Sequence, residues 1–177
     1  MGQEHIEVLF DADRIASRVT ALGQEIARGE PSDLLIVVIL KGSFVFAGDL
    51  IRAIEAAGTS ARVDFMTLSS YGSKTESSGN VRVVHDLSED VAGQTVLIVD
   101  DILESGRTIA HACDLLRKRK AADIKTCLLL DKPEKRLIDI KADYLGFEIG
   151  NIFVVGYGLD FANKYRGLPY IGSIRAN

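Results

Sequence analysis

The sequence predicts an α/β fold with a central, mainly parallel sheet flanked by helices. Two long apolar runs, "LLIVVIL" (34–40) and "TVLIV" (95–99), lack polar alternation and are typical of parallel strands buried on both faces. Strand-like and helix-like segments also alternate through most of the chain, as they do in βαβ units. The tail instead carries short strands with little helix, which predicts a small β-rich hood packed over the main sheet.

These features fit a single domain over residues 1–177, a length that can bury a sizeable core. We expect the core of the domain to span about residues 10–130. The hood is expected to combine the N-terminal residues with about residues 131–177.

The first third of the chain carries two predicted helices around one strand. Apolar residues recur at helical spacing over 15–26, and Gly29 followed by Pro31 ends that helix. The apolar run 34–40 follows as a buried strand. A second stripe of apolar residues over 47–54 then predicts another helix on the sheet.

The middle of the chain returns to strands. "ARVDFMTLSS" (61–70) alternates like a strand, and "VRVVHDL" (81–87) resumes strand character. Between them lies "SYGSKTESSGN" (70–80), whose Gly, Asn and Ser residues predict a long mobile loop. The dipeptide "GQ" (93–94) then turns the chain into the strand "TVLIVDD" (95–101).

The last third holds one more helix and the strands that follow it. Apolar residues over 109–116 predict the helix, and "IKTCLLL" (124–130) predicts a strand. The segments "DYLGFEI" (143–149), "FVVGYG" (153–158) and "YIGSI" (170–174) are predicted as the short strands of the tail.

Ligands of open α/β sheets bind beyond the carboxyl ends of the strands. This rule places the expected site at "LKGS" (40–43), "VDDILESGRT" (99–108) and "LDK" (130–132).

Composition and simple sequence patterns disfavour several classes of function. The formal net charge of -4 lacks the basic excess of a general nucleic-acid binder, and no segment has the pattern of a membrane span or a secretory signal. Cys113 and Cys127 lie in apolar surroundings without CxxC spacing, which favours free thiols in the cytoplasm. His5, His85 and His111 share no metal-ligand spacing with them, so a zinc site is not expected.

The segment "VLIVDDILESGRT" (96–108) joins a buried strand to three carboxylates and a turn. Asp100 and Asp101 fall at the end of the strand, and Glu104 precedes "SGRT" (105–108), which opens a helix. Unpaired N–H groups and the helix dipole bind phosphate at such a turn. Because three carboxylates would repel that anion, a divalent cation or sugar hydroxyls must engage them. The pattern therefore indicates a ligand with a phosphate, vicinal hydroxyls and Mg²⁺.

On these residues, the segment 96–108 resembles the phosphoribosyl pyrophosphate (PRPP) motif of the type I phosphoribosyltransferases. Four further segments resemble the hypoxanthine-guanine members of that family: "LKGSFVFAGDL" (40–50), "SSYGSK" (69–74), "LLLDKPEKR" (128–136) and "NIFVVGYGLDFANKYRGLPYIG" (151–172). The resemblance implies the type I phosphoribosyltransferase fold and a role in purine salvage. The implied reaction transfers the 5-phosphoribosyl group from PRPP to hypoxanthine, or to guanine, and gives IMP or GMP and pyrophosphate.

The resemblance also implies which residues hold PRPP and Mg²⁺. The Lys41–Gly42 peptide, which can be cis in the family, would offer backbone N–H groups to pyrophosphate. The loop that carries Ser70 and Tyr71 would close over the site and exclude water. Asp100 and Asp101 would orient the ribose hydroxyls. Asp100 would also bind Mg²⁺, and Asp160 would bind it through pyrophosphate. The full implied set of PRPP and phosphate ligands is Lys41, Gly42, Ser70, Tyr71, Asp100, Asp101, Ser105, Gly106, Arg107, Thr108 and Arg166.

The purine ligands implied by the resemblance are Lys132, Phe153 and Val154. Lys132 would donate to O6 of a 6-oxopurine, Phe153 would stack on the ring, and the backbone of Val154 would meet the base edge. Glu104 stands where many family members carry an Asp that acts as general base toward the N7 proton. Glu104 is therefore the catalytic candidate, although its side chain is one methylene longer, and positioning of the purine is the alternative role.

Other functions stay open on the sequence alone. A phosphoribosyltransferase for xanthine, adenine or orotate would share the PRPP motif, although Lys132 and "FVVGYGLD" (153–160) argue against adenine and orotate. A PRPP-sensing regulator that binds RNA would keep the fold without catalysis. The acidic charge and the intact loops at 40–43 and 70–71 disfavour that regulator. Family members are dimers or tetramers, so the resemblance implies a homodimer or homotetramer.

Overall fold

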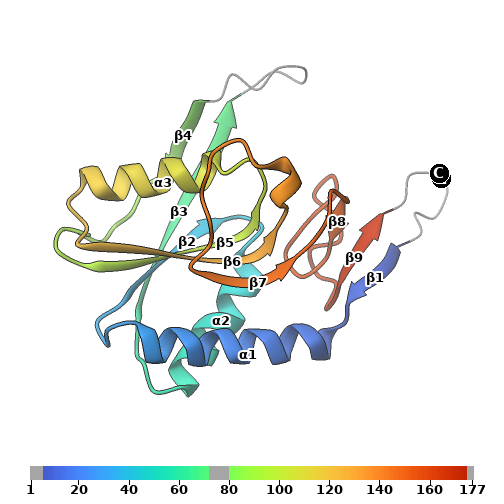
Figure 1. Ribbon diagram of the computed structural model, residues 1–177, viewed down its shortest axis with the longest axis horizontal. Coiled ribbons are helices and arrows are strands. Elements are labelled where there is room, and N and C mark those ends of the chain that lie inside the picture. Colours follow the sequence, from blue (N-terminus) through green and yellow to red (C-terminus); the bar gives the residue numbers. More distant parts are fainter. Residues whose placement is uncertain (1–5, 72–79, 175–177) are drawn as a thin grey trace.

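The computed structural model describes residues 6–71 and 80–174. The larger of its two sheets has six strands in the order β4-β3-β2-β5-β6-β7, and only β4 runs antiparallel to its neighbour (Figure 1). This arrangement confirms the predicted α/β fold with a mainly parallel sheet. The strands are β2 (Leu35–Leu40), β3 (Arg62–Tyr71), β4 (Asn80–His85), β5 (Thr95–Leu103), β6 (Asp123–Asp131) and β7 (Tyr144–Glu148).

Three helices cover the two faces of this sheet. Helices α1 (Ala12–Gly29) and α2 (Phe44–Ala56) lie on one face, and α3 (Arg107–Lys118) lies on the other (Figure 1). The carboxylate of Asp11 caps the first turn of α1 by accepting a 2.8 Å hydrogen bond from the N–H of Arg14. No helix in the described part of the chain has the length and apolarity needed to cross a membrane.

Strand β2 shows why its sequence is a continuous apolar run. Ile36 and Val38 belong to the hydrophobic core beneath α1 and α2, whereas Leu35, Val37 and Ile39 belong to the core beneath α3. Alternate side chains of a strand point to opposite faces, so a strand covered on both faces needs apolar residues at every position. The predicted buried strand is confirmed here.

A second sheet of three antiparallel strands lies at one end of the molecule, in the order β1-β9-β8 (Figure 1). Its strands are β1 (Ile6–Phe10), β8 (Val154–Val155) and β9 (Ile171–Ile174). The N-terminal strand pairs with the end of the described chain, with Ile6 opposite Ile174. Two segments that are remote in sequence therefore build this hood together.

Strand β7 differs from the sequence-based expectation. The tail segment that contains it was predicted to belong to the hood, but β7 is the edge strand of the large sheet, parallel to β6. Gly146 permits this pairing, because a Cβ at that position would lie 2.3 Å from the backbone oxygen of Leu129. A short 3₁₀ helix, η1 (Pro133–Lys135), follows β6 and begins the connection to β7.

Candidate active site

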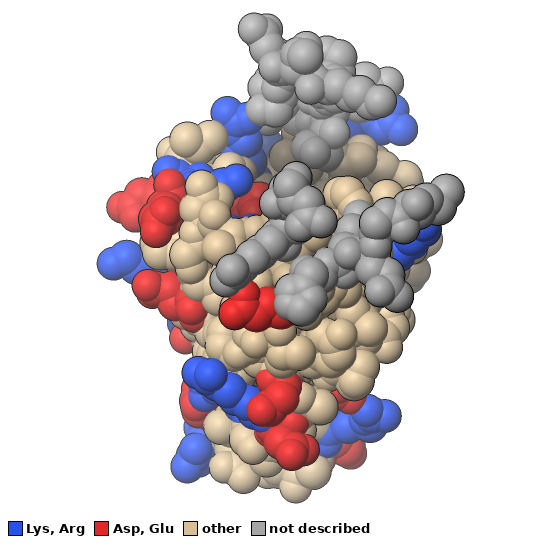
Figure 2. Space-filling model, turned by 90° about the vertical axis from the view of Figure 1, so that its right-hand side faces the viewer, with Lys and Arg blue, Asp and Glu red and all other residues tan. Residues whose placement is uncertain are grey.

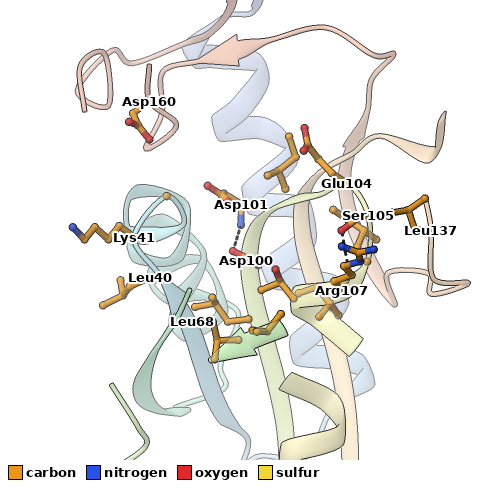
Figure 3. Close-up of a pocket in the computed structure, with 18 residues that line it drawn as sticks. Leu40, Lys41, Leu68, Asp100, Asp101, Glu104, Ser105, Arg107, Leu137 and Asp160 are labelled. Atoms are coloured by element: carbon orange, nitrogen blue, oxygen red, sulfur yellow. Dashed lines mark hydrogen bonds between the residues drawn. The ribbon is translucent and has the colours of Figure 1, made fainter. Parts of the chain in front are cut away.

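A cavity of about 690 Å³ opens at the carboxyl ends of β2 and β5 (Figure 3). Two loops define it: the segment after β2, with Lys41 and Gly42, and the segment from β5 into α3. Ten residues predicted for the site line this one cavity: Lys41, Gly42, Asp100, Asp101, Glu104, Ser105, Gly106, Arg107, Thr108 and Asp160. The position agrees with the rule that ligands of parallel sheets bind at the carboxyl ends of the strands.

The turn before α3 has the geometry of an anion site. Gly106 adopts a left-handed backbone conformation with φ of 84°, and the helix begins at the next residue. The N–H groups of the first helical turn have no partner within a helix and lie at the positive end of its dipole. The carbonyl of Ser105 accepts 3.0 Å hydrogen bonds from the N–H groups of Leu137 and Ile138, so the segment after η1 holds the turn in place.

Asp100 and Asp101 lie side by side at the end of β5 and face the cavity (Figure 3). Asp100 is buried, and its Oδ1 accepts a 2.9 Å hydrogen bond from the N–H of Asp101. Burial raises the pKa of Asp100 well above its ordinary value, and the charge of Asp101 raises it further. Burial also raises the pKa of Asp101, while its hydrogen bonds and the charge of Arg166 act in the opposite direction.

The two carboxylates have the chemistry of a site for a divalent cation. Among residues 6–71 and 80–174, neither carboxylate forms an ion pair with Lys or Arg within 4.0 Å. The same residues contain no group of three or more His, Cys, Asp or Glu side chains that could hold a metal by themselves. Such a site matches Mg²⁺, which proteins often bind through one or two carboxylates and the phosphates of a substrate.

The burial of Asp100 predicts that Asp100→Asn stabilises the fold. The pKa of the carboxyl is raised in the folded protein, so ionisation at neutral pH favours the unfolded chain, and asparagine removes that cost. The asparagine Oδ1 can still accept from Asp101. We expect the melting temperature at pH 7 to rise by a few degrees, and the gain to shrink toward pH 4, where the unfolded-state carboxyl of the wild type also becomes protonated.

Thermal melts followed by circular dichroism test this expectation. The matched control is Asp114→Asn on the exposed face of α3, where the side chain is 64% exposed and pairs with Arg117. That variant should gain no stability. An unchanged or lower melting temperature for Asp100→Asn at pH 7 would show that the fold does not penalise the buried charge.

The loop after β2 is packed directly against the acidic pair. A Cβ added to Gly42 would lie 1.6 Å from Oδ2 of Asp101, so only glycine leaves room for that carboxylate. A Cβ added to Gly158 would in turn lie 2.1 Å from the backbone oxygen of Gly42. Gly158 also has a φ of 102°, which favours glycine. The loop, the acidic pair and the segment after β8 therefore form one tightly stacked unit. The side chain of Lys41 points away from the two aspartates (Figure 3).

The cis peptide of this loop joins Leu40 to Lys41. The sequence resemblance had placed a possible cis bond one position later, at Lys41–Gly42. The motif identifies the loop, but the residue types do not determine which of its peptide bonds is cis.

Glu104 lines the cavity and is paired with Lys132, which does not itself line it. Nζ of Lys132 lies 2.6 Å from Oε1 of Glu104, and the lysine side chain is 5% exposed while the glutamate side chain is 42% exposed. Lys132 is held in place by its N–H, which donates a 2.9 Å hydrogen bond to the carbonyl of Leu103. The ends of β5 and β6 thus bring an acidic and a basic side chain from separate motifs into direct contact.

Three other predicted residues, Phe153, Val154 and Arg166, do not line this cavity. Phe153 is about half exposed and meets Phe161 edge to face, with ring centroids 5.6 Å apart, and Val154 is buried in β8. Arg166 donates a 2.6 Å hydrogen bond to the carbonyl of Gly158 and pairs with Asp160 at 2.6 Å. Arg166 lines a second cavity of about 320 Å³ rather than the main one.

Ser70 and Tyr71 end β3, but their side chains and residues 72–79 lie outside the described structure. The expected closure of this loop over the site therefore stays a prediction.

Two residues of the site carry no role in the sequence-based prediction. Gly158 packs on Gly42, and Arg136 bridges the backbone of Glu104 to Asp131. Both lie inside segments already recognised as motifs, but their contacts join segments remote in sequence. A glycine in a loop and an arginine after a turn give no local signal of such contacts.

Comparison with known proteins agrees with this geometry. Residues 5–162 match the family model of the phosphoribosyl transferase domain. The hypoxanthine-guanine phosphoribosyltransferase of Bacillus subtilis is 46% identical over 171 residues, which cover 96% of this chain and 93% of the relative. The enzyme of the same name from Dictyostelium discoideum is 43% identical over 171 residues, covering 96% of this chain and 95% of the relative.

Solved structures extend the likeness to three dimensions. A hypoxanthine phosphoribosyltransferase from Staphylococcus aureus superimposes with a TM-score of 0.88 at 42% identity, covering 96% of this chain and 91% of the other. This chain therefore shares its fold with that enzyme over most of its length. This chain belongs to the phosphoribosyltransferase family, and within it to the hypoxanthine-guanine phosphoribosyltransferases.

Proposed function

We propose that this enzyme transfers the 5-phosphoribosyl group of PRPP to hypoxanthine, and to guanine, and releases pyrophosphate. The observation that carries the proposal is the contact between Glu104 and Lys132, 2.6 Å apart, because Glu104 lines the cavity that also holds the turn before α3 and the acidic pair. A 6-oxopurine presents O6 as an acceptor and N7–H as a donor on one edge. A lysine and a glutamate side by side match that edge.

The two ends of PRPP would be held by separate parts of the cavity. The turn from Ser105 to Thr108 offers N–H groups and hydroxyls to the 5′-phosphate, and Asp100 and Asp101 accept from the ribose hydroxyls. Pyrophosphate would lie beside the loop at Lys41 and Gly42. Fixing both ends of the substrate orients C1 of the ribose toward the purine and supplies much of the rate enhancement through positioning.

Charge separation in the transition state would be stabilised by the same groups. The ribosyl group gains cationic character while charge builds on the departing pyrophosphate. Mg²⁺ held by the acidic pair would supply charge neutralisation when it is bound. The backbone N–H groups of the 41–42 loop donate to the leaving group. Arg166 is well placed to add its charge, because Gly158, whose carbonyl it contacts, packs on Gly42.

The remaining features of the protein fit an enzyme of the cytosol rather than a regulator that binds RNA. On the face seen in Figure 2, basic and acidic side chains are interspersed, and the visible described surface shows no continuous basic patch. Both cysteines of the chain are free and buried, which suits a reducing compartment. Assembly into a homodimer or homotetramer is part of the same proposal.

A direct assay tests the function. The protein is mixed with PRPP, Mg²⁺ and hypoxanthine, guanine, xanthine or adenine in turn, and nucleotide formation is followed. We expect product with hypoxanthine and guanine and little with adenine, because an exocyclic amino group offers Lys132 no acceptor comparable to O6. Absence of product with every 6-oxopurine would refute the proposal, and an RNA gel shift under the same conditions would then support the regulator.

Glu104→Ala is expected to lower kcat with hypoxanthine by about 10²-fold, because the group that faces the N7 proton is removed. The KM for PRPP should change little, since the phosphate turn and the acidic pair remain. Steady-state kinetics with each substrate varied provides the measurement. The variant Glu104→Gln then separates the two roles of this residue. If Glu104 is the general base, kcat should fall in this variant as well. If kcat stays at the wild-type value, Glu104 only positions the purine by hydrogen bonding.

A further inference from the structure

Arg136 connects the two segments that carry the acid and the lysine. Its side chain is 15% exposed and follows η1. One guanidinium nitrogen donates a 2.7 Å hydrogen bond to the backbone carbonyl of Glu104, and another pairs with the carboxylate of Asp131, which is also 15% exposed. Asp131 directly precedes Lys132 at the end of β6.

The next two residues extend this connection. The N–H groups of Leu137 and Ile138 donate to the carbonyl of Ser105, so residues 136–138 hold the backbone of both Glu104 and Ser105. The cavity is lined by Glu104 and Ser105 but not by Arg136. The contacts of Arg136 instead reach the site through the backbone of Glu104 and the carboxylate of Asp131.

The arginine is suited to this position by its shape. A guanidinium presents several N–H donors in a rigid fork and can satisfy two acceptors at fixed directions, whereas a lysine ammonium acts as a single flexible point charge. One acceptor, the carbonyl of Glu104, directly follows β5, and the other, the carboxylate of Asp131, ends β6, so the fork sets the relative position of the two strand ends. Because Glu104 and Lys132 must reach one purine edge together, small shifts between these strands change the chemistry.

We propose that Arg136 is a positioning residue for the purine half of the reaction, aligning the Glu104 carboxylate with the Lys132 ammonium. This inference rests on the proposed function. It predicts that Arg136→Met lowers kcat/KM for hypoxanthine by between about ten- and a hundredfold. The KM for PRPP should stay within about threefold of the wild type, since the acidic pair and the phosphate turn remain.

Arg18 provides a matched control. It also bridges a carboxylate and backbone carbonyls, pairing with Glu25 at 2.7 Å and donating to Leu145 and Gly146, but it lies away from the cavity. Arg18→Met should lower the melting temperature by about as much as Arg136→Met does. It should not lower kcat/KM for the purine selectively over that for PRPP. A loss of similar size in both variants, or an equal loss for PRPP and purine, would reduce Arg136 to a structural role and overturn the proposal.

A double-mutant cycle with Glu104→Ala gives the sharper test. If Arg136 acts through Glu104, Arg136→Met should have little further effect on kcat in the Glu104→Ala background. Fully additive effects would contradict the proposal. Should Arg136→Met fail to fold, Arg136→Lys keeps a cation beside Asp131 but cannot make both contacts, and it should show a smaller loss of the same selectivity.

The wild-type assay comes first and separates the two proposals. If the wild type shows no turnover with any 6-oxopurine, the proposed function is refuted. If the wild type is active but Arg136→Met lowers kcat/KM equally for purine and PRPP, only the role of Arg136 is refuted.

Discussion

Gly42→Ala is expected to lower kcat/KM by at least about 10²-fold. The added Cβ would lie 1.6 Å from Oδ2 of Asp101 and 2.7 Å from its Cγ, far inside contact distance. Either the carboxylate rotates out of the cavity or the loop moves away from β5. Both responses separate the proposed pyrophosphate loop from the acidic pair, so we expect the KM for PRPP to rise and kcat to fall.

Gly48→Ala is the matched control for this substitution. Gly48 lies in α2, six residues further on, and a Cβ there would meet no heavy atom within 4 Å. Activity should be retained, and the free energy of unfolding should rise by about 0.5–1 kcal/mol because alanine favours helix. Near-normal activity of Gly42→Ala would show that the loop and the acidic pair need not pack this closely.

Lys132→Met is expected to lower kcat/KM for hypoxanthine and guanine by about 10²-fold. Methionine is of similar length, but it removes the charged donor proposed to bind O6, and a hydrogen bond to a charged group contributes about 1.5–3 kcal/mol. The KM for PRPP should remain close to the wild-type value. Discrimination between hypoxanthine and adenine should narrow, because the selecting group is lost.

Steady-state kinetics with all three bases measures this effect. Lys135→Met, on the exposed side of η1 three residues away, is the control and should behave as the wild type. Unchanged discrimination against adenine in Lys132→Met would assign purine selectivity to other groups, such as the backbone around Val154.

The sequence predicted the parts of the fold that follow from local patterns. The run from Leu35 to Leu40 is apolar at every position, and helix α1 follows the spacing of Ile15 through Ile26, because side-chain period reports burial directly. The turn at Gly106 was predicted because "SGRT" follows a strand and opens a helix, and glycine accepts the left-handed conformation that the structure shows there.

Local patterns failed where pairing across the chain decides the structure. Strand β1 was not predicted as a strand, since its five residues gain their partners only from β9 at the other end of the chain. Strand β7 looked like the neighbouring hood strands, but Gly146 lets it lie beside Leu129 in the large sheet. Strand propensity does not identify the partner strand.

The same division applies to the candidate site. By itself, the sequence indicated the acidic pair and the phosphate turn, because both belong to one short segment with its own chemistry. The purine ligands followed only from the resemblance to the family and stay a prediction. Only the tertiary structure placed Lys132 against Glu104, packed Gly42 against Asp101 and gave Arg136 partners at the ends of two strands. These contacts depend on how the strand ends are aligned, and packing of the whole sheet fixes that alignment.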